Sequence, residues 1–536
     1  MSLLDISGLT LSIGALPILR DVTLSIAAGE ILAVTGESGS GKSMTALAVM
    51  RLLPQAAATR GAVYLEDEDL CALSEDEMCQ RRGRDIGMVF QEPMTALNPV
   101  MTIGAQVMET ILIHTETSTA DAQAEAARVL TRVGLPPERF PLDRYPHELS
   151  GGQRQRVVIA MAIALRPKLL IADEPTTALD VTTQAQILDL LRDLVREYGM
   201  GLMIITHDLA VVAGLADRIV VMRKGEVVER GPTMSVLTHQ RHPYTRMLFE
   251  ASRHAVTLPA APAAPAPLLE VREAVRDYTT PRKGWLGKPG RFRAVNNVSF
   301  TLHKGERLGL VGESGCGKST LTRALLGLEE LQGGELLLNG KPLSARRSPA
   351  ERQAMQVVFQ DPYGSFNPRH RVERLVTEPF HLSPDAPMGR ARQDLVAQVL
   401  EDVGLSAADA QKYPHQFSGG QRQRIAIARA LITRPELILF DEAVSALDVS
   451  VRARILDLIA DLCDAYGLTY LFISHDLSVV REVCDRVLVM QKGEIVEQGP
   501  VEDVFTAPRH AYTQTLLAAA PVLPDITPTE PLEAPA

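Results

Sequence analysis

The sequence predicts an α/β protein in which one domain plan occurs twice in tandem. Three observations support this prediction: an internal repeat across most of the 536 residues, short apolar runs that alternate with helical patterns, and an Ala/Pro-rich stretch between the copies. Five short motifs recur in the same order, and such a long repeat indicates two homologous domains. Strands that alternate with helices favour a parallel sheet with helical crossovers.

The repeat and the composition together predict the domain boundaries. We expect domain 1 over residues 1–257, a linker over 258–267, domain 2 over 268–520 and a tail over 521–536. The linker reads LPAAPAAPAP, which is typical of a semi-rigid extended spacer. The tail is rich in proline and acidic residues, so we expect it to be disordered.

Hydrophobic periodicity predicts the elements inside each domain. In domain 1, short apolar runs bounded by turn residues or acids predict three buried parallel strands, over 30–34, 168–172 and 201–205. Apolar residues spaced by three and four predict a helix over 187–198. Further helices are expected over 153–165 and 421–431, and a mostly helical lobe over 91–150 and again over 360–418.

Composition excludes several classes of function. The net charge is −10 and aromatic residues make up 4% of the chain, which argues against a basic, base-stacking nucleic-acid surface. The apolar run over 157–165 is far below the roughly 18 residues of a membrane span, and the N-terminus lacks the pattern of a signal peptide. Five cysteines without a C-x-x-C pair favour a reducing compartment. We therefore expect no direct nucleic-acid partner, and membrane contact only through other proteins.

Each copy carries a Gly-rich segment between a predicted strand and a predicted helix, the arrangement of a phosphate-binding P-loop. Its glycines let successive backbone N–H groups turn toward one anion, while the lysine reaches the β/γ-phosphates and the serine hydroxyl ligates Mg²⁺. The first P-loop comprises Gly36, Glu37, Ser38, Gly39, Ser40, Gly41, Lys42 and Ser43, and the second comprises Gly312, Glu313, Ser314, Gly315, Cys316, Gly317, Lys318 and Ser319.

An acidic pair closes an apolar strand in each copy, as Asp173–Glu174 and Asp441–Glu442. In P-loop enzymes such an aspartate holds Mg²⁺, and the carboxylate beside it can orient or deprotonate the attacking water. A solvated helix cap is the alternative reading of two adjacent acids. His207 and His475 follow at the ends of later strands, where an imidazole could hydrogen-bond a γ-phosphate.

A second Gly-rich segment begins a long helix in each copy. It contains Ser150, Gly151, Gly152 and Gln153 in the first copy and Ser418, Gly419, Gly420 and Gln421 in the second. Alone, this pattern is equally a flexible turn followed by a helix N-cap. In order, the P-loop, Gln91 or Gln360, the Ser-Gly-Gly-Gln segment, the acidic pair and the histidine resemble the nucleotide-binding domains of the ATP-binding cassette (ABC) superfamily.

This resemblance implies two tandem P-loop NTPase domains, each with a RecA-like core, an antiparallel β part and a helical subdomain. It further implies an intramolecular dimer in which the P-loop of each domain shares one ATP with the Ser-Gly-Gly-Gln segment of the other. Glu174, Glu442, His207 and His475 are the implied catalytic residues. The implied Mg²⁺ ligands are Ser43, Gln91 and Asp173 in the first copy, and Ser319, Gln360 and Asp441 in the second. Thr320 and Tyr278 join the second nucleotide site, where Tyr278 is the adenine-stacking aromatic expected after the first strand; Ile13 stands there in copy one.

Within the superfamily the match narrows to the ATPases of bacterial dipeptide, oligopeptide and nickel importers. The residues that carry this likeness are FQEPMTALNP at 90–99, FQDPYGSFNP at 359–368, Tyr-Pro-His at 145–147 and 413–415, and RHPYT at 241–245. The fused arrangement is similar to glutathione and microcin-type peptide importers. The resemblance implies ATP hydrolysis coupled to peptide import, two membrane permease subunits, an external substrate-binding protein and a peripheral position on the cytoplasmic face of the inner membrane. The alternative is a soluble ABC ATPase that acts on the ribosome or on DNA.

Overall fold

The computed structural model describes residues 2–177, 179–260, 266–282, 289–383, 385–445 and 447–524. Within the predicted linker, residues 261–265 lie outside this part of the chain. Residues 525–536 of the predicted tail also lie outside it, so the expectation that this part is disordered stays a prediction.

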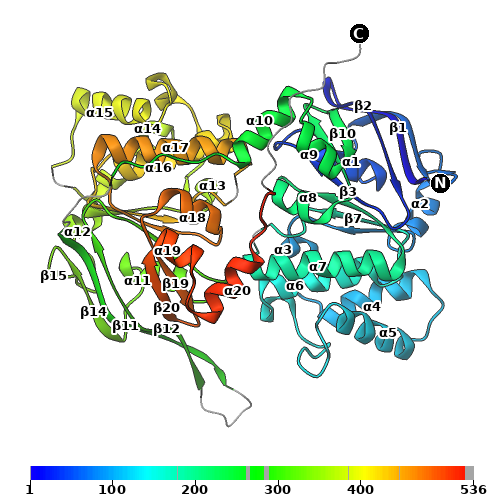
Figure 1. Ribbon diagram of the computed structural model, residues 1–536, viewed down its shortest axis with the longest axis horizontal. Helices are drawn as coiled ribbons and strands as arrows, with labels where there is room; N and C mark the ends of the chain where they lie inside the picture. Colours follow the sequence, from blue (N-terminus) through cyan, green and yellow to red (C-terminus); the bar gives the residue numbers. More distant parts are fainter. Residues whose placement is uncertain are drawn as a thin grey trace.

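Two domains with the same order of elements lie side by side (Figure 1). The strands of domain 1 are β1 (Ser2–Ile13), β2 (Leu16–Ala27), β3 (Ile31–Thr35), β4 (Ala57–Leu65), β5 (Glu68–Asp69), β6 (Ile86–Val89), β7 (Leu169–Asp173), β8 (Gly201–Ile205), β9 (Arg218–Arg223) and β10 (Glu226–Pro232). Its helices are α1 (Lys42–Val49), α2 (Glu75–Arg81), α3 (Pro93–Ala96), α4 (Ile103–His114), α5 (Thr119–Arg132), the 3₁₀ turn η1 (Pro146–Glu148), α6 (Gly151–Ile163), α7 (Val181–Tyr198), α8 (Leu209–Leu215), α9 (Thr233–His239) and α10 (Pro243–Ser252).

Domain 2 repeats this order. Its strands are β11 (Pro267–Arg282), β12 (Pro289–His303), β13 (Arg307–Val311), β14 (Gly333–Leu338), β15 (Lys341–Pro342), β16 (Met355–Val358), β17 (Leu437–Asp441), β18 (Tyr470–Ile473), β19 (Arg486–Gln491) and β20 (Glu494–Pro500). Its helices and 3₁₀ turns are α11 (Lys318–Leu325), α12 (Pro349–Ala354), α13 (Pro362–Ser365), α14 (Val372–Val376), η2 (Glu378–Leu382), α15 (Gly389–Asp402), η3 (Ala407–Gln411), η4 (Pro414–Gln416), α16 (Gly419–Leu431), α17 (Val449–Tyr466), α18 (Leu477–Val483), α19 (Val501–Thr506) and α20 (Ala511–Ala519).

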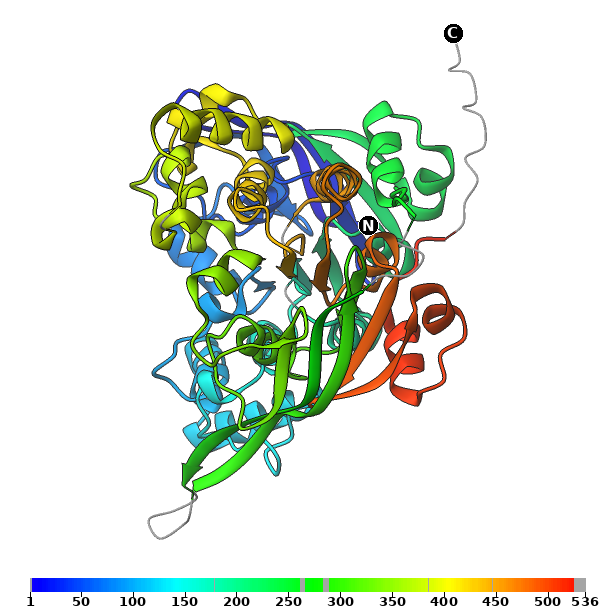
Figure 2. The same ribbon diagram turned by 90° about the vertical axis from the view of Figure 1, so that its left-hand side faces the viewer.

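Each domain contains a six-stranded sheet and a four-stranded antiparallel sheet. The six-stranded sheet of domain 1 has the order β10-β9-β3-β8-β7-β6, in which only the pairing of β10 with β9 is antiparallel. The four-stranded sheet has the order β2-β1-β4-β5, and domain 2 repeats both sheets. In domain 2, β11 and β12 are the counterparts of β1 and β2, and Figure 2 shows them in green as two long strands that extend beyond the body of that domain. This confirms the predicted α/β fold, built twice.

The central strand β3 is apolar throughout because both of its faces are buried. Ile31 and Ala33 belong to the core under the helices of the helical lobe and α7, whereas Leu32 and Val34 belong to the core shared with α1 and the four-stranded sheet. A strand covered on both faces reads as a continuous apolar run, as the sequence pattern predicts. Helix α1, which begins at the P-loop, is thereby held between the two sheets.

Most of the observed bounds differ from the predicted ones by one or two residues, but α7 begins at Val181, six residues before the predicted start of 187, because Asp180 caps it. Strands β3 and β7 begin and end one residue later than predicted, and β8 has the predicted bounds. Helices α6 and α16 begin two residues before the predicted starts, because Ser150 and Ser418 cap them and the two glycines form the first turn. The stretches 91–150 and 360–418 contain the short helices of the predicted lobes.

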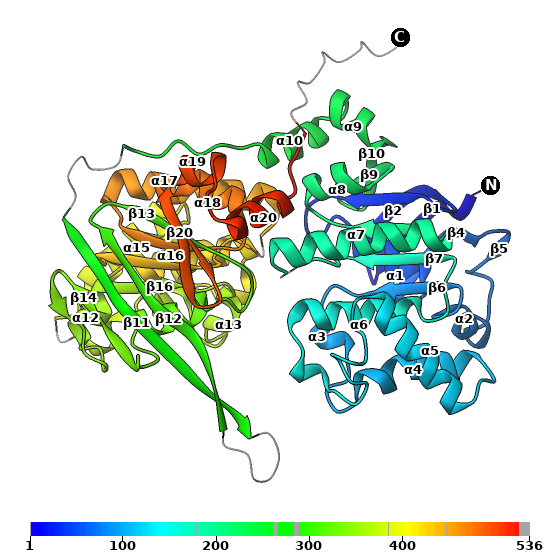
Figure 3. The ribbon, with the colours of Figure 1, turned by 60° about the horizontal axis from the view of Figure 1, so that its bottom comes forward.

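The last helix of each domain lies against the other domain. Helix α10 packs against α17 and α20 packs against α7, between the two halves in Figures 1 and 3. Beyond these helices, Val256 packs against the core of domain 2 and Leu523 against the core of domain 1. The two crossing segments also meet, since Arg253 Nη2 donates to the carbonyl oxygen of Pro524 at 2.6 Å. Across the described ranges, no helix is both long and apolar enough to cross a membrane.

Candidate nucleotide-binding sites

The P-loop of domain 1 connects β3 to α1 through three glycines with positive φ. Gly36, Gly39 and Gly41 have φ values of 148°, 76° and 103°, and Gly312, Gly315 and Gly317 repeat this pattern. A Cβ atom on Gly36 would lie 2.2 Å from the carbonyl oxygen of Met222, whereas one on Gly39 would meet no heavy atom within 4 Å. Position 36, at the base of the loop, therefore requires glycine because the Met222 carbonyl lies so close. The tip of the loop at Gly39 is open and can receive an anion.

The P-loop lysines are buried and held by carbonyl groups. Lys42 Nζ donates to the Gly36 oxygen at 2.7 Å and to the Glu37 oxygen at 2.9 Å. Lys318 Nζ makes the same two bonds, at 2.7 and 2.9 Å, to Gly312 and Glu313. Burial lowers the pKa of Lys42 from its ordinary value, although the surrounding carboxylates favour the charged form. Each ammonium group therefore lies at the base of its own P-loop, where two backbone carbonyl groups accept hydrogen bonds from it.

Two of the candidate Mg²⁺ ligands of domain 1 are in direct contact. Ser43 Oγ donates to Asp173 Oδ1 at 3.1 Å, although these residues are 130 positions apart. Burial raises the pKa of both Asp173 and Asp441. A serine hydroxyl and a carboxylate are hard oxygen donors of the kind Mg²⁺ prefers, so this donor pair fits the ion.

The two glutamines implied as metal ligands make different contacts. Gln91 Nε2 donates to Glu174 Oε2 at 2.9 Å, whereas Gln360 Nε2 donates to Ser445 Oγ at 3.4 Å. The structure therefore places Gln91, but not Gln360, directly against the acidic pair of its own domain. In the described residues no group of three or more His, Cys, Asp or Glu side chains could hold a metal ion.

The backbone conformation fixes the orientation of the glutamate in each acidic pair. Glu174 N–H donates to the Ile205 oxygen at 2.9 Å, which extends the β7–β8 pairing by one residue, and the chain then turns with a φ of 47° at Glu174. Glu442 repeats the arrangement, with its N–H on the Ile473 oxygen and a φ of 51°. A non-glycine residue in this region is strained by about 1–2 kcal/mol, and such strain often occurs at functional sites.

Each of these glutamates faces the histidine of its own domain. His207 Nδ1 lies 3.2 Å from Glu174 Oε1, and His475 Nδ1 lies 3.5 Å from Glu442 Oε1. Burial alone would raise the pKa of Glu174, but the hydrogen bond and positive charge of His207 outweigh it and lower the pKa to about 2. The pKa of His207 is raised because the contact with Glu174 outweighs burial.

The Ser-Gly-Gly-Gln segments form the first turns of α6 and α16. Ser150 Oγ accepts from Gln153 N–H at 3.3 Å while Gln153 Oε1 accepts from Ser150 N–H at 3.0 Å, and Ser418 and Gln421 form the same capping box. Gly152 lies against Thr183, since a Cβ atom there would be 2.3 Å from the threonine methyl group. The exposed serine and first glycine of each segment therefore sit at a tightly packed helix start.

The hydrogen bonds between each P-loop and the other domain come from the segments that follow the acidic pairs, at the starts of α7 and α17. Asp448 Oδ1 accepts from the N–H of Ser38 at 2.9 Å, and Ser450 Oγ donates to the Glu37 carboxylate. In the reciprocal direction Asp180 Oδ2 accepts from Ser314 N–H at 3.4 Å, and Thr182 Oγ1 donates to Glu313 Oε1 at 2.6 Å. Each P-loop is thus contacted by the other domain, in a head-to-tail arrangement.

Sequence reasoning assigned no role to these interdomain contacts. Asp180 and Asp448 do recur 268 residues apart, the same interval that separates the acidic pairs. That shared interval was the only sign in the sequence that these two aspartates have equivalent roles. Their contact with the opposite P-loop depends on how the two domains pair, and a local sequence pattern does not contain that information.

An interdomain cavity of about 220 Å³ lies beside the two histidines that face Glu174 and Glu442. Its lining includes His207 and Thr177 from domain 1 and His475, Ser445 and Arg452 from domain 2. Both catalytic histidines implied by the sequence therefore border one space at the interface.

Tyr278 lies within β11 rather than after it, because that strand continues to Arg282. Its hydroxyl contacts Thr320 Oγ1 at 3.3 Å and donates to Glu329. The guanidinium of Arg276 lies 4.9 Å from the centre of the Tyr278 ring. Tyr278 is thus tied to the helix that begins at the second P-loop, with one ring face already covered by a cation.

Comparison with known proteins agrees with this architecture. The family model described as "ABC transporter" matches residues 19–177 and 295–445, and "Oligopeptide/dipeptide transporter, C-terminal region" matches 228–259 and 496–533. The glutathione import ATP-binding protein GsiA of Escherichia coli K12 is 48% identical over 94% of this chain and 86% of its own length. The GsiA protein of Salmonella choleraesuis is likewise 48% identical, with the same coverage.

A solved dimeric structure of a bacterial ABC transporter cassette has 32% identity and a TM-score of 0.39, and covers 43% of this chain and 98% of its own. The match to the ABC transporter model falls once in each domain and includes both P-loops and both acidic pairs. The chain therefore belongs to the ABC transporter family, as an ATP-binding, ATP-hydrolysing protein that carries two cassettes in one polypeptide.

Proposed function

We propose that the chain hydrolyses MgATP at two composite interdomain sites and thereby drives the import of glutathione or related small peptides through two membrane permeases. Its ATPase activity and its work with permeases follow from the family. The proposal itself comprises the composite sites, the Mg²⁺ ligands, the cargo, an external substrate-binding protein and a position on the cytoplasmic face of the inner membrane. The reciprocal contacts between each P-loop and the other domain carry it.

In the first site, Lys42 and the open P-loop would bind the phosphates, and Ser43 and Asp173 would hold Mg²⁺. Bound MgATP supplies the γ-phosphoryl group that reacts with water. Glu174 is already aimed by its backbone and held by His207 and Gln91. Because the pKa of Glu174 is about 2, its carboxylate is a weak base and is better suited to orient the attacking water than to deprotonate it fully. The second site would use Lys318, Ser319, Asp441, Glu442 and His475.

Removal of both glutamate charges tests these roles. Glu174→Gln combined with Glu442→Gln keeps the side-chain volumes but removes the carboxylates, so hydrolysis should fall by about 10²-fold or more, with ATP retained on the protein. Turnover of radiolabelled ATP and nucleotide retention on a desalting column measure the two effects. As a matched control, Glu226→Gln alters an exposed carboxylate on β10 and should leave turnover unchanged. Undiminished hydrolysis in the double variant would falsify the proposed roles.

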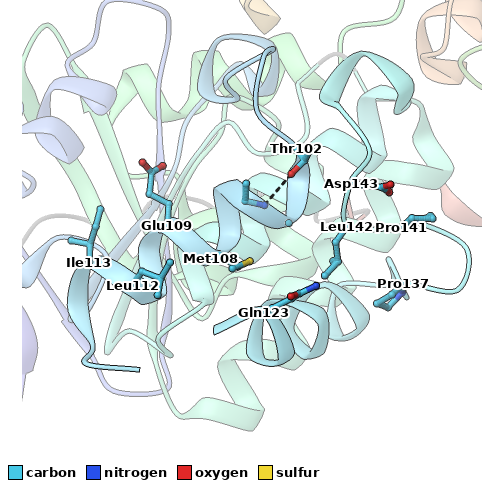
Figure 4. A pocket seen from close by; sticks show the side chains of 12 residues that line it. Thr102, Met108, Glu109, Leu112, Ile113, Gln123, Pro137, Pro141, Leu142 and Asp143 are labelled. Carbon is cyan, nitrogen blue, oxygen red and sulfur yellow. Dashed lines mark hydrogen bonds between the residues drawn. The ribbon is translucent and has the colours of Figure 1, made fainter. Parts of the chain in front are cut away.

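The helical lobes offer two grooves for the permeases. A groove of about 850 Å³ in domain 1 lies between α4, the start of α5 and the segment 137–143. Figure 4 shows Met108, Leu112 and Ile113 along α4, with Gln123 and Leu142 opposite. The Leu112 and Ile113 side chains are exposed. This surface suits an apolar permease segment.

The corresponding part of domain 2 has different chemistry. A groove of about 940 Å³ there includes Arg374, Thr377 and His381, which are the counterparts, 269 residues further along, of Ala105, Met108 and Leu112. Charged and polar residues thus replace apolar ones. We therefore infer two different permease subunits, the one on domain 2 presenting an acidic segment.

Substitutions in the grooves test this assignment. Leu112→Asp should weaken co-purification of one permease by about tenfold or more, and Arg374→Glu that of the other, while ATP hydrolysis by the isolated chain is retained. Leu16→Asp, an exposed apolar position on the antiparallel sheet, is the control. Loss of both permeases with either variant, or of neither, would contradict two distinct docking partners.

A further inference from the structure

The RHPYT motif at 241–245 and its counterpart RHAYT at 509–513 place a tyrosine at the start of α10 and α20. Tyr244 and Tyr512 are buried, with 2% and 7% of their surface exposed. The Tyr244 N–H donates to His242 Nδ1 at 3.1 Å, and the Glu229 carboxylate accepts from the N–H groups of Arg241 and His242. Glu497 and His510 repeat these bonds in domain 2, so the alanine in place of Pro243 leaves the local structure unchanged.

Each tyrosine hydroxyl reaches the P-loop of its own domain. Tyr244 Oη accepts from Glu37 N–H at 2.9 Å, and Tyr512 Oη accepts from Glu313 N–H at 2.9 Å. The Glu37 N–H and the Gly36 carbonyl belong to one peptide unit, and that carbonyl accepts from Lys42 Nζ at 2.7 Å. One planar group is therefore bonded at one end by the tyrosine and at the other by the catalytic-site lysine.

The first residue of this peptide unit has no side chain that could hold the orientation of the unit. Gly36 has no side chain, and its φ of 148° is one that other residues rarely adopt. Because a peptide unit is planar, any rotation that released the Glu37 N–H would also turn the Gly36 carbonyl away from Lys42. The hydrogen bond from the N–H to Tyr244 thus fixes the acceptor that positions the ammonium group.

The same loop meets the other domain. Ser450 donates to the Glu37 carboxylate, Asp448 accepts from Ser38 N–H at 2.9 Å, and α10 packs against α17, which begins at Val449. The tyrosine therefore lies where its own P-loop, its own C-terminal helix and the opposite domain meet. Tyr512 has the same position relative to Thr182 and Asp180.

We propose that Tyr244 and Tyr512 are positioning residues for the P-loop lysines, which they act on through the Gly36–Glu37 and Gly312–Glu313 peptide units. They make the affinity of each site for ATP depend on the docking of the C-terminal helix. This inference rests on the proposed function, because it assumes that ATP binds at these P-loops.

The test uses the full chain with Tyr244→Phe, Tyr512→Phe and both together. Phenylalanine keeps the buried ring and removes only the hydroxyl group, which accepts the hydrogen bond from the P-loop. Leaving a partly buried N–H unpaired should raise the KM for MgATP by about tenfold in the double variant, with kcat changed less than about twofold. The Kd for MgATP, measured by calorimetry in the Glu174→Gln/Glu442→Gln background, should rise by a similar factor.

Tyr470→Phe provides the matched control for a merely structural effect. Tyr470 is fully buried in domain 2 and its hydroxyl donates to the carbonyl of Val483, away from the P-loop. This variant should lose thermal stability but keep the wild-type KM and Kd.

The outcomes separate the inference from the function on which it rests. Wild-type KM and Kd in the double Phe variant, or a fall in kcat alone, would overturn the positioning role while MgATP binding by the unaltered P-loops still stands. A rise in KM shared by Tyr470→Phe would overturn it too, because the effect would then follow from stability. If the chain with intact tyrosines binds no MgATP, the proposed function itself fails.

Discussion

Glu174 and Glu442 show how single residues reach the site. Each follows the last residue of a buried strand, and the neighbouring strand binds its N–H before the chain turns into the left-handed region. The order of strand, aspartate and glutamate was visible in the sequence, so the identity of these residues was predictable. The hydrogen-bond partners of these glutamates were less predictable, because Gln91 contacts Glu174 whereas Gln360 contacts Ser445.

The pair of Glu174 and His207 predicts a pH-dependent stability. Folding lowers the pKa of Glu174 from 4.5 to about 2, so its contribution is present above pH 4.5 and is lost as the pH falls toward 2. Folding raises the pKa of His207 above 6.5, so its contribution is present below pH 6.5 and is lost as the pH rises through the raised value. The pair therefore stabilises the protein most between these limits.

His207→Gln should accordingly lower the melting temperature by a few °C near pH 5.5, on the order of 2–4 °C per kcal/mol, and by less at pH 9. Differential scanning calorimetry of both proteins at these two pH values measures the difference. His147→Gln, at an exposed position, is the control. A difference that stays constant with pH would show that the ion pair does not contribute.

At the scale of elements, the start of α6 combines a structural and a proposed functional role. The capping box of Ser150 and Gln153 closes the first turn, and the same box occurs in α2 with Ser74 and Glu77. Both serines satisfy backbone N–H groups that the helix leaves unpaired. Only Ser150 belongs to a segment proposed to face a nucleotide.

Ser150→Ala and Ser74→Ala should each cost about 1 kcal/mol of stability, because each removes a helix N-cap. ATP hydrolysis should fall several-fold in Ser150→Ala and stay at the wild-type rate in Ser74→Ala. Chemical denaturation and a coupled ATPase assay provide the two measurements. An equal loss of activity in both variants would assign the effect to folding alone.

At the scale of the whole molecule, the two domains exchange their C-terminal segments. Val256 leaves domain 1 and packs on the core of domain 2, Leu523 does the reverse, and His254 Nε2 lies 2.6 Å from Asp457 Oδ1. These contacts do not involve the P-loops. The domains should therefore stay associated without nucleotide.

Val256→Asp combined with Leu523→Asp should weaken this association, because each change places a charge at an apolar contact. Small-angle scattering without nucleotide should then give a larger radius of gyration than the wild-type chain. Val522→Asp is the control, since Val522 is 77% exposed. An unchanged scattering curve in the double variant would mean that the crossing segments do not hold the domains together.

The sequence by itself determined the α/β class, the duplication, the P-loops, the acidic pairs and the family resemblance. These features are local: a strand buried on both faces must be apolar throughout, and a phosphate-binding turn needs glycines at set positions. Their spacing in the chain is therefore enough to find them.

Only the tertiary structure decided which residues meet across the interface. Asp448 meets Ser38, the tyrosines of the C-terminal motifs meet the P-loop backbone, and the two grooves differ in chemistry. Asp448 and Ser38 are 410 residues apart. Such contacts depend on how two folded domains pack, and periodicity within about 20 residues carries no information about that packing.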